Sequence, residues 1–206
     1  IQKIDPISRQ FLGSVDVFFL FPAKHFITDA PQLTRALKTI KQELTERLAA
    51  LEKEGKMLEA ERLKRRTNYD LALIREIGYC NGIENYSRHF SGKTKGEPPE
   101  TLLSYFPHLP DGTPDFLTII DESHVTVSQI GCMYGGDASR KKSLVEHGFR
   151  LPSACDNRPL TAKEFEERIG QVIYTSATPG SYELEKSTTV AEQVIRPTGL
   201  VDPEIA

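Results

Sequence analysis

The chain has 206 residues, of which 38% are hydrophobic and 27% charged, a composition typical of folded globular domains rather than of disordered or fibrous chains. Its net charge of −3 excludes a uniformly basic polyelectrolyte of the histone kind, although its 26 Lys and Arg residues can still gather in one groove. No apolar run approaches the roughly 18 residues of a membrane span, so we expect no membrane partner.

Three scattered cysteines without a C-x-x-C spacing indicate a reducing, cytoplasmic compartment with neither disulfides nor structural zinc. The sequence begins at Ile1 without an initiator methionine or targeting segment and stops at Ala206 within a mixed polar run. We therefore expect an internal piece of a longer protein.

The first 28 residues alternate turn signals with short apolar stretches. Residues 17–21, which Pro22 stops, are a strand candidate. We predict the remnant of a β-rich unit here.

Helical periodicity begins after Thr28-Asp29, a predicted N-cap followed by Pro31 in the first turn. Apolar side chains three and four residues apart continue to residue 51, and a second helical stretch covers about 56–77. Because a straight rod over residues 29–77 would be ~70 Å long, we predict a helical hairpin that turns near Gly55.

Residues 38–66 are about half charged, which we interpret as a solvated helix face rather than a nucleic-acid contact. Three pairs have the favourable spacing of four residues, each worth ~0.2–0.5 kcal/mol. They are Glu43/Arg47, Glu52/Lys56 and Glu61/Arg65.

Two compact apolar runs, 116–120 and 172–174, show no alternation and are predicted to be strands buried on both faces of a parallel sheet. A helical stretch at 161–169 precedes the second run. Buried strands separated by helices favour an α/β core. Residues 132–160, rich in Gly, Ser and basic side chains, are predicted to be an excursion from that core.

Asp121-Glu122-Ser123-His124 directly follows the first apolar run, at the strand end where parallel sheets bind ligands. A nucleoside-triphosphate hydrolase needs one carboxylate for hydrated Mg²⁺ and a second group that orients the attacking water. We assign Asp121 to the metal and Glu122 to the water. The alternative for any Asp-Glu pair is an ordinary surface position.

Small hydroxyl residues follow the second apolar run, in the segment Thr175-Ser176-Ala177-Thr178-Pro179-Gly180. We expect Ser176, Ala177 and Thr178 to couple the acidic motif to a neighbouring lobe. The alternative is a simple Pro-Gly turn.

Ser91-Gly92-Lys93-Thr94 imitates a phosphate-binding loop, but the full motif needs a glycine where Ser87 stands. No buried strand leads into it, so we reject it. The chain is predicted to carry the metal-and-water half of an ATP site without the phosphate-binding half.

The excursion mixes basic and aromatic residues, a combination suited to nucleic acid, although a solvated basic surface is the alternative. The candidates for DNA contact are Arg140, Lys141, Lys142, Arg150 and Arg158.

Several sequence blocks form a specific combination. They are Gly82-Ile83-Glu84-Asn85-Tyr86-Ser87-Arg88-His89, Gly96-Glu97-Pro98-Pro99, Asp121-Glu122-Ser123-His124-Val125-Thr126-Val127, Gly148-Phe149-Arg150-Leu151-Pro152-Ser153, Asp156-Asn157-Arg158-Pro159-Leu160, Ser176-Ala177-Thr178-Pro179-Gly180 and Arg196-Pro197-Thr198-Gly199-Leu200. Together they resemble the UvrB family, the UvrB component of the bacterial excinuclease ABC, over nearly the whole chain and most weakly over residues 1–16.

The resemblance implies an α/β fold with an incomplete RecA-like parallel sheet of the P-loop NTPase, superfamily 2 helicase-like class, a long helical hairpin and a β-rich N-terminal remnant. It implies a DNA-dependent ATPase that verifies damage in nucleotide excision repair, uses ATP and Mg²⁺, is loaded on damaged double- or single-stranded DNA by UvrA, and recruits UvrC for incision. Asp121, Glu122, Ser123 and His124 would be the nucleotide-binding motif II, and residues 176–178 motif III.

The resemblance also implies a division of the chain into five sections. Residues 1–28 would end the UvrA-binding domain, 29–131 would belong to the first RecA-like domain with the helical hairpin and motif II, and 132–160 would form a small lobe beside a DNA-clamping hairpin. Residues 161–197 would return to the first RecA-like domain, and 198–206 would lead toward the second motor domain.

Ser128, Cys132 and Thr175 depart from the residues usual in the family and leave the acidic motif intact. Without its phosphate loop the piece alone is expected not to hydrolyse ATP, and its incomplete sheet is expected to expose apolar surface. Two alternatives stay open: a non-catalytic docking module for UvrA or DNA, and a different superfamily 2 helicase. A G-x-x-x-x-G-K-[ST] loop elsewhere in the longer protein would favour the enzyme over the docking module.

Overall fold

The computed structural model describes residues 1–5, 7–20, 28–195 and 199. Its α-helices and strands, in chain order, are β1 (Gln2–Ile4), β2 (Phe11–Ser14), α1 (Ala30–Lys53), α2 (Met57–Ile77), α3 (Ser87–Ser91), β3 (Leu117–Ile120), α4 (Ser123–Glu146), α5 (Ala162–Glu166), β4 (Gln171–Tyr174) and α6 (Ser181–Lys186). Short 3₁₀ helices lie at η1 (Ile83–Tyr86), η2 (Leu102–Tyr105) and η3 (Pro152–Asp156). None of the helices in the described ranges is long and apolar enough to cross a membrane.

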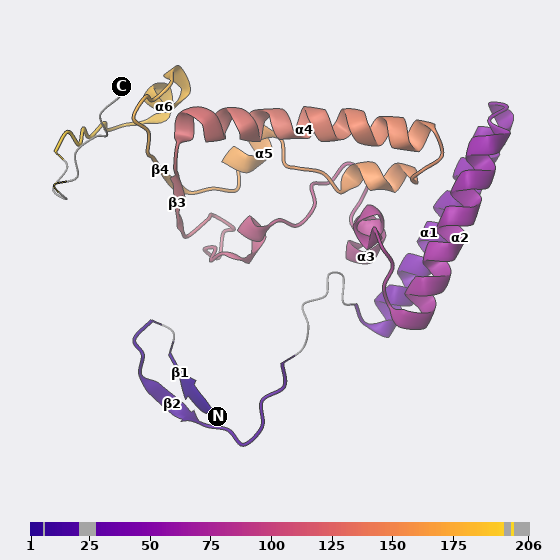
Figure 1. Cartoon of the computed structure of the whole chain (residues 1–206), viewed down its shortest axis with the longest axis horizontal. Coiled ribbons are helices and arrows are strands. Elements are labelled where there is room, and N and C mark those ends of the chain that lie inside the picture. Colours follow the sequence, from indigo (N-terminus) through magenta and orange to yellow (C-terminus); the bar gives the residue numbers. More distant parts are fainter. Residues whose placement is uncertain (6, 21–27, 196–198, 200–206) are drawn as a thin grey trace, which may run out of the picture.

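The predicted helical hairpin is confirmed, with α1 and α2 side by side (Figure 1). Asp29 caps α1, since its carboxylate accepts from the Gln32 N–H at 2.8 Å, and this bond satisfies one of the free donors of the first turn. The turn contains Gly55 at φ +76°, and α2 ends at Gly78 at φ +73°. Both positions need a left-handed backbone, which glycine adopts without steric cost.

The main hydrophobic core lies between this hairpin and the segment that follows it. Its members come from the facing sides of α1 and α2, from residues 80–90 and from the lobe after α4. They are Ala36, Ile40, Leu44, Leu51, Ala60, Leu63, Leu71, Ile74, Cys80, Ile83, Tyr86, Phe90 and Leu151. Since burial of one large aliphatic side chain is worth about 1.5–3 kcal/mol, this cluster contributes strongly to the stability of the hairpin.

The chain after α4 packs directly on α2. Gly148 has φ +70°, and a Cβ at this position would lie 2.3 Å from the carbonyl oxygen of Glu59. Next to it the Arg62 guanidinium lies 4.3 Å above the Phe149 ring and donates to the His147 carbonyl at 2.7 Å. These contacts join the end of α4 to the hairpin.

The two predicted parallel strands are confirmed as β3 and β4, which pair in parallel from Leu117–Gln171 to Ile120–Tyr174. Helices α4 and α5 cover the face that carries Ile120 and Tyr174. The expectation that both faces are buried is wrong for this chain, because Ile119 and Ile173 on the other face are 62% and 47% exposed. In the described residues this face is covered only in part.

At the N-terminus, β1 and β2 form an antiparallel hairpin, which agrees with a β-rich remnant. The strand predicted at 17–21 is wrong for residues 17–20, which are irregular, and its last position and Pro22 lie outside the described residues. A β-favouring run becomes a strand only when a neighbour supplies the ladder hydrogen bonds, and here β1 pairs with residues 11–14 instead.

Helix α4 runs unbroken from Ser123 to Glu146 (Figure 1). The boundary predicted between 131 and 132 therefore falls inside a helix, although Gly131, Gly135 and Gly136 lower its intrinsic helix propensity. A helix is also confirmed within 161–169: α5 begins after Thr161, whose hydroxyl accepts from the Glu164 N–H at 3.2 Å.

Candidate functional site at the carboxyl ends of the parallel strands

The acidic motif and the hydroxyl-rich segment meet at one edge of the small sheet. Asp121 follows β3 and Thr175 follows β4. The Thr175 N–H donates to the Ile120 carbonyl at 2.9 Å, and the Ser123 N–H donates to the Thr175 carbonyl at 3.1 Å. The strand pairing thus continues one step beyond the sheet and holds the two segments in register.

Asp121 is held by two donors on the same oxygen. The Thr175 hydroxyl donates to Oδ1 at 2.7 Å and the Glu122 N–H at 3.0 Å. The Thr175 hydrogen bond, followed by that of the Glu122 N–H, lowers the pKa of the Asp121 carboxyl below its ordinary value. The side chain is exposed, and its Oδ2 has no hydrogen bond from the described residues. It is an ionised carboxylate with one oxygen open to solvent.

Glu122 has a left-handed backbone at φ 46°, a conformation that costs a non-glycine residue about 1–3 kcal/mol. Its side chain is 69% exposed, and its Oε2 lies 3.6 Å from Nδ1 of His124. The same His124 nitrogen lies 2.8 Å from the Ser176 hydroxyl, which in turn accepts from the Thr178 N–H at 3.0 Å. The structure therefore brings the predicted motif II and motif III residues together, with Ala177 exposed between the two hydroxyl residues.

Ser123 and Glu183 form a buried pair that the sequence did not reveal. Ser123 is completely buried, and its hydroxyl donates to Glu183 Oε1 at 2.9 Å. Glu183, on α6, is also buried. Sixty positions separate the two residues, so no local spacing could have linked them.

The rejection of residues 91–94 as a phosphate loop is confirmed. Gly92 caps the C-terminus of α3 rather than following a strand. The Lys93 ammonium donates to the Pro98 carbonyl at 2.9 Å and pairs with Glu100, while the Thr94 hydroxyl bonds Glu97. These groups serve a local turn.

The predicted DNA-contact residues have different environments. Lys141 is buried against Asp137, and Arg158 forms an ion pair with Glu164 at 2.7 Å. Arg140 is exposed and also pairs with Asp137, Arg150 donates to a backbone carbonyl, and Lys142 is exposed. Two of the five candidates therefore serve the interior of the lobe, and their contact with DNA stays a prediction.

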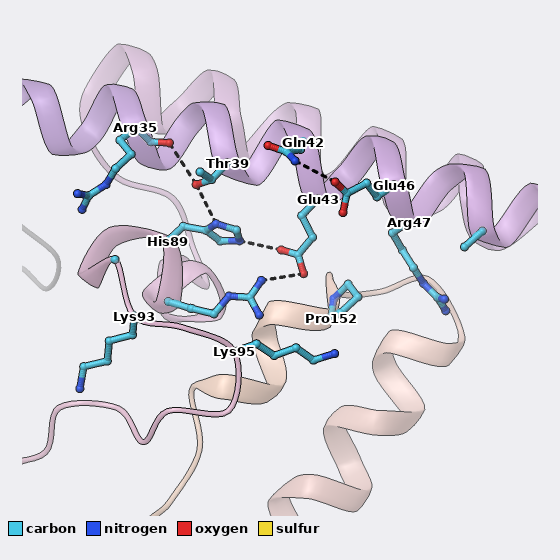
Figure 2. A pocket seen from close by; sticks show the side chains of 13 residues that line it. Arg35, Thr39, Gln42, Glu43, Glu46, Arg47, His89, Lys93, Lys95 and Pro152 are labelled. Atoms are coloured by element: carbon cyan, nitrogen blue, oxygen red, sulfur yellow. Dashed lines mark hydrogen bonds and ion pairs between the residues drawn. The ribbon is translucent and has the colours of Figure 1, made fainter.

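A second polar cluster, missed by the sequence analysis, joins α1, α3 and η3 (Figure 2). Glu43 accepts from His89 Nε2 at 2.7 Å, from the Ser153 N–H at 2.8 Å and from Arg88 at 3.3 Å. Arg88 also pairs with Asp156 at 2.6 Å. Burial alone would raise the pKa of Glu43, but the bonds from His89 and Ser153 and the charge of Arg88 bring the pKa below its ordinary value.

In the described part of the chain, no three or more His, Cys, Asp and Glu side chains converge as a metal site. Asp121 and Glu122 are the two exposed carboxylates that directly follow β3. Mg²⁺ commonly takes one or two protein carboxylates and completes its shell with water and substrate phosphates. The donor chemistry at Asp121 fits that mode and not an all-protein metal cage.

Comparison with known proteins gives matches over the whole chain. Residues 31–92, which contain α1 to α3, match a family model described as the UvrB third helical domain. The UvrABC system protein B of Streptomyces coelicolor and that of Streptomyces avermitilis are each 56% identical over 205 residues, covering 100% of this chain and 28% of each relative. That of Streptococcus pneumoniae Hungary19A-6 is also 56% identical, and 30% of it is covered. The chain spans less than a third of the length of these relatives.

Proposed function

The chain belongs to the UvrB family, and on that premise we propose that it supplies the metal-and-water half of the ATP site in a DNA-dependent, helicase-like ATPase of the RecA-like class. This ATPase recognises damage in bacterial nucleotide excision repair in the cytoplasm. UvrA loads it on DNA, and it recruits UvrC for incision.

One observation carries the proposal: the acidic pair leaves the carboxyl end of a parallel strand, next to the hydroxyl segment of the neighbouring strand. The Thr175–Asp121 and Ser176–His124 contacts, at 2.7 and 2.8 Å, hold these four side chains at one sheet edge. Ligands of open parallel sheets bind at this edge. Both acids are exposed at this edge, so they would be accessible to a bound nucleotide.

Each residue has a distinct role in this proposal. Asp121, kept ionised by its two donors, would hold Mg²⁺ through water, and the metal would neutralise charge on the phosphates. Glu122, held on a strained backbone and largely exposed, would orient the attacking water. Ser176 would transmit the state of the site through His124, which lies between the Glu122 carboxylate and the Ser176 hydroxyl.

A docking module without catalysis is the second candidate, and the N-terminal hairpin favours it. Apolar side chains of residues 1–20 are widely exposed. They are Ile1, Ile4, Ile7, Phe11, Leu12, Val17, Phe18, Phe19 and Leu20. An exposed apolar surface of this kind marks a protein interaction site, here one for UvrA.

The test uses the Streptomyces coelicolor relative with its matching section replaced by this chain. We expect the chimera to hydrolyse ATP in the presence of DNA and Mg²⁺. Glu122→Gln should lower turnover by ~10²–10⁴-fold, as expected when a water-orienting group is lost, while ATP stays bound. Asp121→Asn should raise the Mg²⁺ concentration that turnover requires.

Glu185→Gln is the matched control, because Glu185 is an exposed carboxylate on α6, and it should leave turnover unchanged. Full turnover with Glu122→Gln would overturn the catalytic role and favour the docking module. If the 206-residue chain alone hydrolyses ATP and Glu122→Gln abolishes this activity, the proposal that the chain holds only half of an ATP site is contradicted.

A further inference from the structure

A cavity of 650 Å³ lies between α1 and the segment after α3, with Pro152 at one end. We call it the α1 groove. Figure 2 shows Arg35 and Arg47 extending from α1, with Lys95 on the opposite side and the Lys93 side chain directed away from α1. Five Lys and Arg side chains line it against two carboxylates, so its wall is cationic in a protein whose net charge is −3.

Some of these cations already have partners. Arg88 is neutralised by Glu43 and Asp156, and Lys93 pairs with Glu100. These two belong to the structural framework of the groove and are not free to bind a ligand.

Of the other three cations, two have no partner among the described residues and one has only a distant carboxylate. The side chains of Arg35 and Lys95 have no hydrogen bond or ion pair with any described residue. Arg47 lies 3.8 Å from Glu54, and its Nε is buried without a hydrogen-bond partner among the residues that the structure describes. A buried N–H without an acceptor is costly, and an anion in the groove would supply one.

We propose that the α1 groove binds the phosphodiester backbone of DNA. Arg35 and Arg47 are 12 positions apart on one helix, which separates their Cα atoms by about 18 Å at ~1.5 Å per residue. One DNA strand advances only ~3.4 Å per phosphate along the duplex axis, so a separation of this size spans several nucleotides of one strand. A mononucleotide cannot reach both arginines, whereas a strand contacts both and Lys95 between them.

Glu46 gives the proposal a second, opposite test. It lies in the groove, where its Oε1 accepts from Gln42 at 3.0 Å, and its charge repels a phosphate. Removal of this charge should therefore strengthen DNA binding. A variant that merely misfolds cannot produce such a gain.

The inference rests on the proposed function, since it names where this chain would contact DNA. The experiment measures binding of a fluorescein-labelled DNA duplex to the 206-residue chain by anisotropy, between about 50 and 200 mM salt. Arg35→Ala/Lys95→Ala should weaken binding about tenfold at low salt and reduce the slope of log K against log [salt] by about 2. Glu46→Gln should strengthen binding by about two- to fivefold.

Matched control variants remove the same number of positive or negative charges at positions outside the α1 groove. Lys64→Ala/Lys163→Ala removes two exposed lysines from α2 and α5 and should leave the salt slope within experimental error of the wild type. Glu185→Gln should leave the affinity unchanged. If the wild-type chain binds DNA, equal losses of affinity in both double variants, or no gain with Glu46→Gln, would overturn the proposal that the α1 groove is the binding site. If the wild-type chain does not bind DNA, both the α1 groove as a DNA site and any DNA contact of this chain are refuted.

Discussion

Replacement of Glu43 by alanine tests whether the polar cluster between α1, α3 and η3 stabilises the hairpin region. Glu43 and Arg88 are 13% and 16% exposed at the side chain. Removal of one partner of a buried ion pair costs about 3–5 kcal/mol. Arg88 keeps its 2.6 Å contact with Asp156, so we expect the lower end, about 3 kcal/mol less free energy of unfolding. Glu43→Gln, which keeps one acceptor oxygen, should cost about 1–2 kcal/mol.

The effect should also depend on pH. The folded-state pKa of Glu43 lies below its ordinary value, so its contribution to stability is complete above the unfolded-state pKa, near 4.5. That contribution is lost as the pH falls through the folded-state pKa. The difference between wild type and Glu43→Ala should therefore shrink as the pH falls below about 4.5.

Urea unfolding followed by far-ultraviolet circular dichroism measures both effects, because most of the helical signal comes from α1, α2 and α4. Glu46→Ala, one turn along α1 and exposed, is the control and should change the free energy of unfolding by no more than about 0.5 kcal/mol. If Glu43→Ala and Glu46→Ala lose equal stability at neutral pH, the cluster does not stabilise the fold and the reasoning fails.

Three further predictions concern other parts of the chain. Gly148→Ala should lower the free energy of unfolding by at least about 2 kcal/mol, because the added methyl meets the backbone of α2 and the position has a left-handed φ; an unchanged urea midpoint would contradict this. Ellman's reagent should label the exposed Cys132 in the folded chain but not Cys80, because burial, followed by a nearby carboxylate, raises the pKa of the Cys80 thiol to about 12; equal labelling rates would contradict this. The bond from Arg158 holds the pKa of Glu164 at about 2, so Arg158→Ala should return that pKa, followed by carboxyl NMR, toward its ordinary value; an unmoved titration would show that the ion pair does not set it.

The helical hairpin could be predicted because its signals are local. The cap at Asp29, the three- and four-residue spacing and the left-handed turn at Gly55 each depend on neighbours within about one helical turn. The two parallel strands were also predictable as apolar runs. Their exposed face was not, because the number of strands and helices that cover a sheet depends on segments distant in sequence.

Charged residues show where local reasoning fails. The spacing of Glu43 and Arg47 predicts an i,i+4 pair, but Glu43 accepts instead from His89, Arg88 and Ser153. A partly buried carboxylate gains more from several donors than from one cation. Tertiary partners 45 or more residues away therefore determined its role.

The candidate site depends both on local sequence patterns and on contacts between residues distant in sequence. Parallel pairing explains why Asp121 and Thr175 meet, and sequence alone could predict that meeting. The buried Ser123–Glu183 bond could not be predicted, yet it fixes the start of α4 to α6. The segment from Thr175 to Glu183 thus contacts the acidic motif at both ends, through Thr175 and Ser176 at one end and through Glu183 at the other. A displacement of this segment alone would break the Thr175–Asp121 and Ser176–His124 contacts, so we expect the acidic pair and the hydroxyl segment to move as one unit.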